Sequence, residues 1–230
     1  MKLFKVSNYD QASQKAAKLI AAQIQAKPDS VIGLPTGSTP VGAYAILVDM
    51  HKRGELDFSK VTTCNLDEYR GIASDDPQSY RYFMDEHLFN HVNIPKENIR
   101  FPDQESPEKY DEQIAAMGGL DFMFLGIGNN GHIGFNEPGS YFPAETRCAP
   151  LSENTIEANA RFFDSPDDVP REAVTMGIKT IMLAEKIILV SSGEAKREAT
   201  HQAIYGPITP ELPGSILQVH RDVTIIWNEQ

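Results

Sequence analysis

Cysteine, long apolar runs and basic tracts are scarce or absent in this chain, and each shortage excludes a class of protein. Cys64 and Cys148 are the only cysteines in 230 residues, too few for a disulfide framework and without the spacing of metal ligands. No window approaches about 18 consecutive apolar residues, and the opening MKLFKVSNYD lacks the apolar core of a signal peptide. We therefore expect a cytoplasmic protein that neither enters a membrane nor is secreted.

The charge balance argues against nucleic acid as a partner. The formal net charge is −11, and no stretch is rich in lysine or arginine. Nucleic-acid binding depends on neutralisation of phosphates by such residues. An anionic small molecule remains a candidate ligand, provided that backbone N–H groups and one or two cations make its pocket locally positive.

Strand-like and helix-like segments alternate along the chain, a pattern typical of an α/β fold. Short apolar or β-branched runs occur at 30–34, 61–66, 120–125, 173–178, 187–191 and 223–227. Helical patterns occur at 11–25, 41–52, 79–89, from 106 onward and at 194–205. This order predicts βαβ units, a mostly parallel sheet and helices on both of its faces.

The segment from 138 to about 170 is longer than a plain connection between two elements. Residues 138–150 lack a regular pattern, and residues 152–163 have helical spacing. Long connections in compact domains are usually functional. We interpret this segment as a lid over the carboxyl edge of the sheet.

The most informative segment is GIGNNGHIGFNEP, residues 126–138, which follows an apolar run. It places Asn130, His132 and Glu137 in a backbone loosened by four glycines. A polar, glycine-rich loop at a strand end is how open α/β sheets build active sites. A lone histidine is more often packed or on the surface, but the neighbouring amide and carboxylate favour an acid/base role.

The same loop contains a misleading signature. Gly126, Gly128 and Gly131 satisfy the G-x-G-x-x-G fingerprint of dinucleotide sites. That fingerprint must open a helix, which would hold the pyrophosphate on its first N–H groups. Here a further glycine and a proline follow within seven residues, so no helix is expected. We therefore expect no nicotinamide or flavin site in this loop.

A second polar turn, at residues 36–39, joins a strand-like run to a helix-like segment. Thr36, Gly37, Ser38 and Thr39 could aim hydroxyls and N–H groups at a phosphate. It is not a Walker A loop, because no Gly-Lys-Ser/Thr follows at the required spacing. The alternative is an ordinary helix N-cap at Thr39 before Pro40, and the pattern alone leaves both interpretations open.

Asp67 and Glu68 follow another apolar run and form the next candidate pair. At a strand end facing the crevice of the sheet, one of them could be a general base with a raised pKa. Two solvated turn residues are the more common outcome for an Asp-Glu pair. His87 and His91 share a metal-like spacing but lack the intervening glutamate and a third ligand, so we expect helix-surface histidines.

Taken together, these segments resemble the glucosamine-6-phosphate deaminase family, also called glucosamine-6-phosphate isomerase. The resemblance covers nearly the whole chain, so we expect a single domain over residues 1–230. It is carried by GLPTGSTP at 33–40, NLDEYRGI at 65–72, QSYRYFM at 78–84, GIGNNGHIGFNEP at 126–138, ARFFD at 160–164 and MGIKTIM at 176–182.

The resemblance implies a Rossmann-like α/β fold and an enzyme of amino-sugar catabolism. The implied reaction converts glucosamine 6-phosphate and water into fructose 6-phosphate and ammonia, without a metal or an organic cofactor. By the same resemblance, Asp67 shuttles the carbon-bound proton, His132 assists ring opening, and Glu137 holds or charges the histidine. The implied phosphate cradle comprises Thr36, Gly37, Ser38, Thr39, Arg161 and Lys196; the two basic residues are not selected by sequence pattern alone.

Two departures from the family bear on mechanism and regulation. Asn130 stands where many members have aspartate, so we expect the imidazolium form of His132 to receive less support, with Glu137 carrying more of it. Longer, hexameric relatives are activated by N-acetylglucosamine 6-phosphate near the lid. This chain keeps Ser140 and Arg147 but has Tyr141 and Ala149. We therefore expect a monomer or small homo-oligomer without that activation.

Two other functions compete with the deaminase interpretation. A 6-phosphogluconolactonase shares the general fold and a glycine-rich loop that ends in Gly-His, but its loop continues differently from residues 133–137 here. A sugar-phosphate-sensing domain of a transcriptional regulator is the non-enzyme alternative. That use is less favoured because the α/β pattern accounts for all 230 residues and leaves none for DNA binding.

Overall fold

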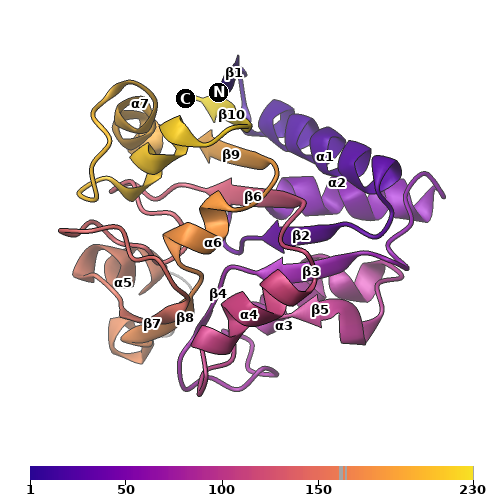
Figure 1. Ribbon diagram of the computed structural model, residues 1–230, viewed down its shortest axis with the longest axis horizontal. Helices are drawn as coiled ribbons and strands as arrows, with labels where there is room; N and C mark the ends of the chain where they lie inside the picture. Colours follow the sequence, from indigo (N-terminus) through magenta and orange to yellow (C-terminus); the bar gives the residue numbers. More distant parts are fainter. Residues whose placement is uncertain (161–162, 164, 230) are drawn as a thin grey trace.

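The computed structural model describes residues 1–160, 163 and 165–229, and a seven-stranded parallel sheet forms its framework (Figure 1). Every neighbouring pair in this sheet runs parallel. In spatial order the strands are β1 (Lys2–Lys5), β10 (Val223–Asn228), β9 (Ile187–Ser192), β6 (Phe122–Gly126), β2 (Val31–Leu34), β3 (Thr62–Asn65) and β5 (Ile99–Arg100). The expected α/β class with a mostly parallel sheet is confirmed.

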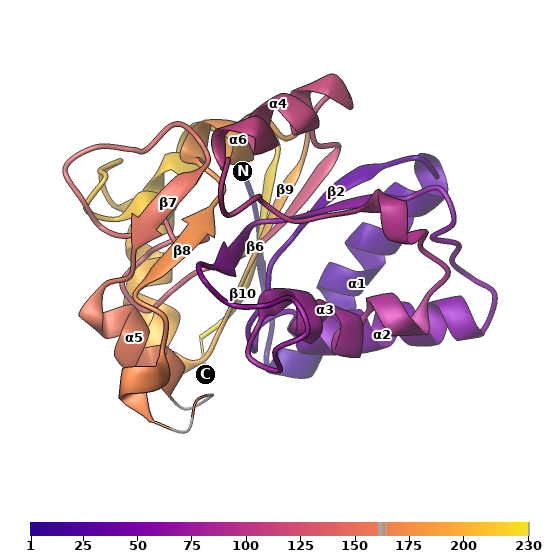
Figure 2. The same ribbon diagram turned by 90° about the horizontal axis from the view of Figure 1, so that it is seen from below.

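Helices cover both faces of the large sheet, as the alternating pattern predicts. Figure 2 shows one group of helices on each side. The first face carries α1 (Tyr9–Ala26), α2 (Val41–Lys52) and α3 (Tyr80–His87). The other face carries α4 (Glu108–Ala116), α6 (Ile178–Met182) and α7 (Arg197–Tyr205). Because neighbouring strand residues point to opposite faces, each central strand supplies both cores.

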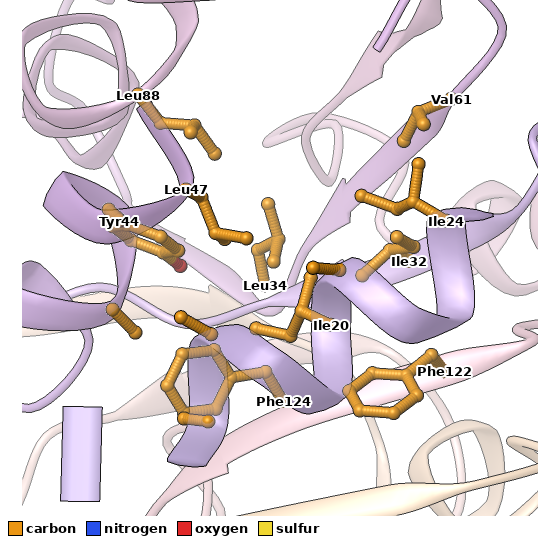
Figure 3. Close-up of a cluster of buried hydrophobic side chains, with 14 of the residues drawn as sticks. Ile20, Ile24, Ile32, Leu34, Tyr44, Leu47, Val61, Leu88, Phe122 and Phe124 are labelled. Carbon is orange, nitrogen blue, oxygen red and sulfur yellow. The ribbon is translucent and has the colours of Figure 1, made fainter. Parts of the chain in front are cut away.

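The larger core lies between α1, α2 and the sheet. Figure 3 shows Ile20 and Ile24 of α1 facing Ile32 and Leu34 of β2, and all four side chains are nearly inaccessible to solvent. Alanines on the same stripe of α1 let the helix approach the sheet closely. Such burial stabilises the fold by roughly 1.5–3 kcal/mol for each large apolar side chain.

A small antiparallel sheet lies beside the large one and was only partly expected. Its order is β4 (Asp67–Tyr69), β8 (Glu172–Thr175) and β7 (Arg147–Pro150). The run expected as one strand at 173–178 therefore divides, because β8 ends at Thr175 and α6 begins at Ile178. Assigning the whole run to one strand was wrong: Gly177 ends the extended backbone and serves as the N-cap of α6.

The segment interpreted as a lid contains β7 and a short helix, α5 (Glu153–Asn159). Ser152 is the N-cap of α5, and its hydroxyl accepts the N–H of Thr155 at 3.2 Å. The buried side chains of Leu151 and Ile156 fasten α5 to the small sheet. In the part of the chain that the structure describes, no helix is long and apolar enough to cross a membrane.

Asp111 on α4 ties this segment to the main framework. Its carboxylate accepts hydrogen bonds from the main-chain N–H of Thr146 at 2.7 Å and from its hydroxyl at 2.6 Å. The hydroxyl of Thr180 on α6 donates a third bond at 2.6 Å. One carboxylate thus joins α4, α6 and the residue that precedes β7.

We expect Asp111→Asn to destabilise the protein by about 1.5–3 kcal/mol. The substitution removes the charge and replaces one accepting oxygen by an NH2 group, so at least one of the three donors from Thr146 and Thr180 loses its acceptor. Urea unfolding monitored by circular dichroism measures the loss. Glu112→Gln, an exposed change on the same helix, should cost less than about 0.5 kcal/mol. Equal stability of the two variants would show that this carboxylate does not fasten the segment.

Candidate active site

The carboxyl ends of several parallel strands surround one cavity. β2 continues into residues 35–39, β3 into residues 66–67, β6 into residues 126–135, and β9 leads to residues 195–196. All of these segments line a cavity of about 280 Å³. In open α/β sheets, ligands bind in the crevice outside the carboxyl ends of the strands. The large sheet therefore brings together the polar residues that the sequence placed far apart.

The glycine-rich loop after β6 forms a turn and no helix, as expected from its sequence. A Cβ atom on Gly128 would lie only 2.3–2.6 Å from the imidazole of His132. A Cβ on Gly134, whose φ is +57°, would lie 3.0 Å from the hydroxyl of Thr175 and 3.5 Å from Oδ2 of Asp67. These glycines leave room for the histidine and for close approach to Asp67, so the dinucleotide signature is a coincidence of spacing.

His132 and Glu137 face each other within this loop. Their closest atoms, Nδ1 of His132 and Oε2 of Glu137, lie 3.5 Å apart, longer than a normal hydrogen bond. Nδ1 is buried and makes no other hydrogen bond among the described residues. The carboxylate is therefore the partner available to an imidazole that lines the cavity.

Glu137 is held as a carboxylate by its neighbours. Its burial would raise the pKa, but the interaction with His132 and hydrogen bonds from Thr155 and Asn130 outweigh burial and lower the pKa to about 2. The amide of Asn130 donates to Oε2 at 2.8 Å, and the hydroxyl of Thr155 donates to Oε1. Glu137 thus presents a fixed negative charge to His132 across the neutral pH range.

Asn130 bonds Glu137 and the main chain of His132, and none of its hydrogen bonds goes to the imidazole. Its amide nitrogen serves Glu137, and its Oδ1 accepts the main-chain N–H of His132 at 3.2 Å. The amide of Asn130 therefore links two points of the loop, and the negative charge beside His132 comes from Glu137. An aspartate could not donate to Glu137 in this way, because an ionised carboxylate has no hydrogen to give.

Asp67 lies at the start of β4 and is only 7% exposed. It lines the cavity together with His132. Burial, reinforced by the charge of Glu68, raises the pKa of Asp67 to about 8. A buried carboxyl with a raised pKa in a polar cavity has the character of a general base or acid.

Glu68 points away from Asp67, because successive side chains of a strand alternate in direction. Its Oε1 accepts the N–H groups of Tyr69 at 2.9 Å and Tyr80 at 2.8 Å, and Oε2 accepts that of Arg81 at 2.9 Å. Glu68 therefore caps the start of α3, whose first residue, Tyr80, lines the cavity. The interpretation of this acid pair as solvated turn residues is wrong for both, since both are buried.

The turn at residues 36–39 does not supply the N-cap of α2, so the interpretation of Thr39 as an ordinary N-cap is wrong. Pro40 is the N-cap residue of α2, and Oγ1 of Thr39 accepts a hydrogen bond from Nζ of Lys196 at 3.0 Å. The hydroxyl of Tyr9 donates to the carbonyl of Ser38 at 3.0 Å and fastens the turn to α1. Thr36, Gly37, Ser38, Thr39 and Lys196 all line the cavity. Arg161 lies outside the described residues.

Several cavity residues carry no signal that sequence pattern could detect. Tyr80 and Phe135 stack with an interplanar angle of 10°, and Thr155 and Asn159 reach the cavity from α5. His87 and His91 take ordinary helix-end roles, His87 against Phe83 and His91 bonded to a main-chain carbonyl. They lie outside the cavity.

Comparison with known proteins places this arrangement in a family. The family model described as glucosamine-6-phosphate isomerases/6-phosphogluconolactonase matches residues 6–227. Glucosamine-6-phosphate deaminase of Clostridium perfringens is 52% identical, covering 100% of this chain and 97% of its own. That of Thermoanaerobacter sp. is 50% identical, with coverage of 100% and 93%.

Solved structures agree. A monomeric glucosamine-6-phosphate deaminase superposes with a TM-score of 0.95 at 43% identity, covering 98% of this chain and 96% of the other. A 6-phosphogluconolactonase of Trypanosoma cruzi shares the fold, with a TM-score of 0.77 at 22% identity and coverage of 99% and 94%. The chain belongs to the glucosamine-6-phosphate isomerase/6-phosphogluconolactonase family and, within it, to the glucosamine-6-phosphate deaminases.

Proposed function

We propose that this chain converts glucosamine 6-phosphate and water into fructose 6-phosphate and ammonia, with the residues of the cavity in the roles described below. The observation that carries the proposal is the placement of three groups around one cavity. The buried carboxyl of Asp67, the imidazole of the His132–Glu137 pair, and the turn at 36–39 with Lys196 all line this cavity. The reaction needs a carbon base, an acid/base for the ring and an anion site.

The 6-phosphate is assigned to the turn at 36–39. Its hydroxyls and N–H groups lie before α2, where the helix dipole favours an anion. Lys196, placed by its bond to Thr39, adds a positive charge. Arg161 is assigned the second cation on its match to the family motif. These groups make the pocket locally positive, as binding of an anionic substrate requires in a chain of net charge −11.

His132 is assigned the opening of the sugar ring. Its imidazole takes the proton of the anomeric hydroxyl while the bond between C1 and the ring oxygen breaks, and it returns a proton to that oxygen. An imidazolium forms briefly between the two transfers. The fixed carboxylate of Glu137, 3.5 Å from Nδ1, stabilises that charge.

Asp67 is assigned the transfer of the carbon-bound proton. As the carboxylate it takes the proton from C2 of the open sugar, and as the acid it delivers a proton to C1. Between these two transfers, the substrate ammonium gives up one proton and O1 takes one, so that the aldehyde oxygen becomes the hydroxyl of C1. The resulting iminium at C2 adds water and releases ammonia, leaving the ketone of fructose 6-phosphate. A raised pKa strengthens the carboxylate as a base, and burial separates its proton from bulk water.

The lactonase alternative is less well supported. A lactonase must activate water and has no use for a carbon base, whereas the buried carboxyl of Asp67 is central to this cavity. Lactonases of known structure are about 20% identical to this chain, compared with about 50% for the deaminases. A sugar-phosphate-sensing domain needs only to bind its ligand and has no use for acid/base groups such as Asp67 and His132 in the cavity.

We also propose the domain organisation and the cellular location of the enzyme. We assign residues 1–230 to one domain, with α5 in a lid at about 138–170. A cytoplasmic location is supported by two unpaired thiols, Cys64 and Cys148, since disulfides are rare in reducing compartments.

The direct test measures ammonia and fructose 6-phosphate released from glucosamine 6-phosphate. We expect turnover by the wild type and a loss of at least about a hundredfold in Asp67→Asn, because the amide cannot accept a carbon-bound proton. Asp29→Asn, an exposed aspartate distant from the cavity, should retain activity. The roles above are wrong if no ammonia forms or if Asp67→Asn is undiminished.

The pH dependence tests the state of Asp67. Because the base must be ionised, kcat/KM should rise with pH through the pKa of about 8. Glu68→Gln removes the neighbouring charge but leaves burial, so the rising limb should move to lower pH by roughly half a unit to one unit. Titration of the substrate amine is common to both enzymes and cancels in the comparison.

The control for this shift is Glu86→Gln, an exposed change on α3, which should leave the limb in place. Circular dichroism checks that α3 survives without its carboxylate cap. Superimposable profiles of wild type and Glu68→Gln would refute the electrostatic link between the two acids.

We propose a monomer or small homo-oligomer without allosteric activation. The similar solved structure is described as a monomeric glucosamine-6-phosphate deaminase. Arg147, one of the two activator-site residues that this chain keeps, is half-buried and donates to Oδ1 of Asn136 at 2.9 Å. We expect hyperbolic kinetics, unchanged by N-acetylglucosamine 6-phosphate, and a small particle in light scattering. Sigmoidal kinetics relieved by that sugar, or a hexamer, would contradict the proposal.

A further inference from the structure

The contact between α5 and Glu137 has no part in the roles assigned above. We propose that Thr155 is a positioning residue that locks the Glu137 carboxylate in the orientation that serves His132. This inference rests on the proposed function, because it concerns the same acid/base pair. It adds a residue from a separate helix to a set otherwise supplied by one loop.

The two oxygens of Glu137 have different partners. Oε2 receives the amide of Asn130 at 2.8 Å and faces Nδ1 of His132 at 3.5 Å. Oε1 receives the hydroxyl of Thr155. Asn130 and His132 belong to the same loop as Glu137 and move with it. Of the described residues that contact this carboxylate through a hydrogen bond or an ion pair, Thr155 is the one that lies outside the loop, on α5.

The hydroxyl of Thr155 is itself held. The hydroxyl of Ser152 donates to Oγ1 of Thr155 at 3.1 Å, so that oxygen already accepts a bond. A hydroxyl has one hydrogen, and here it is directed to Glu137. Thr155 is 3% exposed, so its hydroxyl is largely shielded from solvent. Donation therefore runs from Ser152 to Thr155 and from Thr155 to Oε1 of Glu137, whose Oε2 faces the imidazole of His132.

The position of α5 is set by contacts independent of Glu137. Leu151 and Ile156 are buried in the cluster that includes Tyr69 and Phe135. Asn159, one turn beyond Thr155, donates to the hydroxyl of Tyr69 at 3.0 Å. Helix α5 is thus packed against the small sheet, and the hydrogen bond from Thr155 holds the Glu137 carboxylate in a fixed position relative to that helix.

The consequence for catalysis is geometric and electrostatic. With Oε1 held by Thr155 and Oε2 by Asn130, the carboxylate keeps Oε2 towards the imidazole. The neutral donor Thr155 also stabilises the ionised form of Glu137 without competing for His132. Without it, Asn130 is the remaining donor to the carboxylate among the bonds described above, and the burial of Glu137 is no longer offset to the same extent. The imidazolium that forms during ring opening then loses part of its support.

The test compares Thr155→Val, which keeps the shape and removes the donor, with Thr155→Ser, which keeps the hydroxyl. We expect Thr155→Val to lower kcat by about ten- to a hundredfold, the range for a lost bond to a charged group, with little change in KM. Thr155→Ser should recover kcat to within about threefold of wild type. A wild-type kcat in Thr155→Val, or equal losses in both variants, would overturn the proposal.

Ser152→Ala is the matched control for helix damage. It removes the N-cap of α5 but leaves the Thr155 hydroxyl opposite Glu137. If Thr155 serves only to hold the helix, Ser152→Ala should lower kcat as far as Thr155→Val does, and that result would refute a positioning role. We expect the loss in Ser152→Ala to be at least about fivefold smaller.

A measurement without turnover separates this inference from the proposed function. The imidazole nitrogen resonances of His132, assigned by their absence in His132→Gln, report the contact between Nδ1 and Glu137. We expect the Nδ1 resonance to shift in Thr155→Val and to stay in place in Thr155→Ser and Ser152→Ala. An unmoved resonance in Thr155→Val would overturn the inference even in an active enzyme. A shifted one would support it even if glucosamine 6-phosphate is not the substrate.

Discussion

The parallel strands of the large sheet all end on one edge, and the candidate site is built around that shared direction. β2, β3, β6 and β9 each continue into a polar segment that lines the same cavity. The apolar packing shown in Figure 3 stabilises the strands and leaves their ends free for chemistry. The small antiparallel sheet adds two further parts of the site: β4 holds Asp67, and contacts with Tyr69 of β4 support α5, from which Thr155 and Asn159 reach the cavity.

Two carboxyl groups at this site are driven to opposite protonation behaviour by their surroundings: Asp67 lines the cavity, and Glu137 faces the lining residue His132. Glu137 has donors on both oxygens and a histidine beside it, which lower its pKa to about 2. Asp67 is more deeply buried and lies next to another acid, which together raise its pKa to about 8. When the surroundings of two acids move their pKa values apart, the two groups can take different acid/base roles in the same site. The division matches a reaction that needs a permanent anion beside the histidine and a strong base for carbon.

The sequence was most informative where a signal is local. Apolar spacing predicted α1 and α2, and the strand-to-loop transition at 126–138 predicted a polar crevice. Edge strand β1, with its largely exposed side chains, has no apolar run to reveal it. The run at 173–178 reads as one strand because periodicity does not register the break at Gly177. Thr155 and the capping role of Glu68 depend on contacts between distant segments, so no pattern within one segment could show them.

The fold holds Asp67 and Glu137 in opposite protonation states, and NMR can follow both groups directly. Carbon-13 labelling of the aspartate and glutamate carboxyls, with Asp67→Asn and Glu137→Gln used to assign the resonances, follows both by NMR across pH. We expect Asp67 to titrate near pH 8 while Glu137 stays ionised down to the lowest pH at which the protein remains folded. Titration of both groups near pH 4, as for exposed carboxyls, would contradict it.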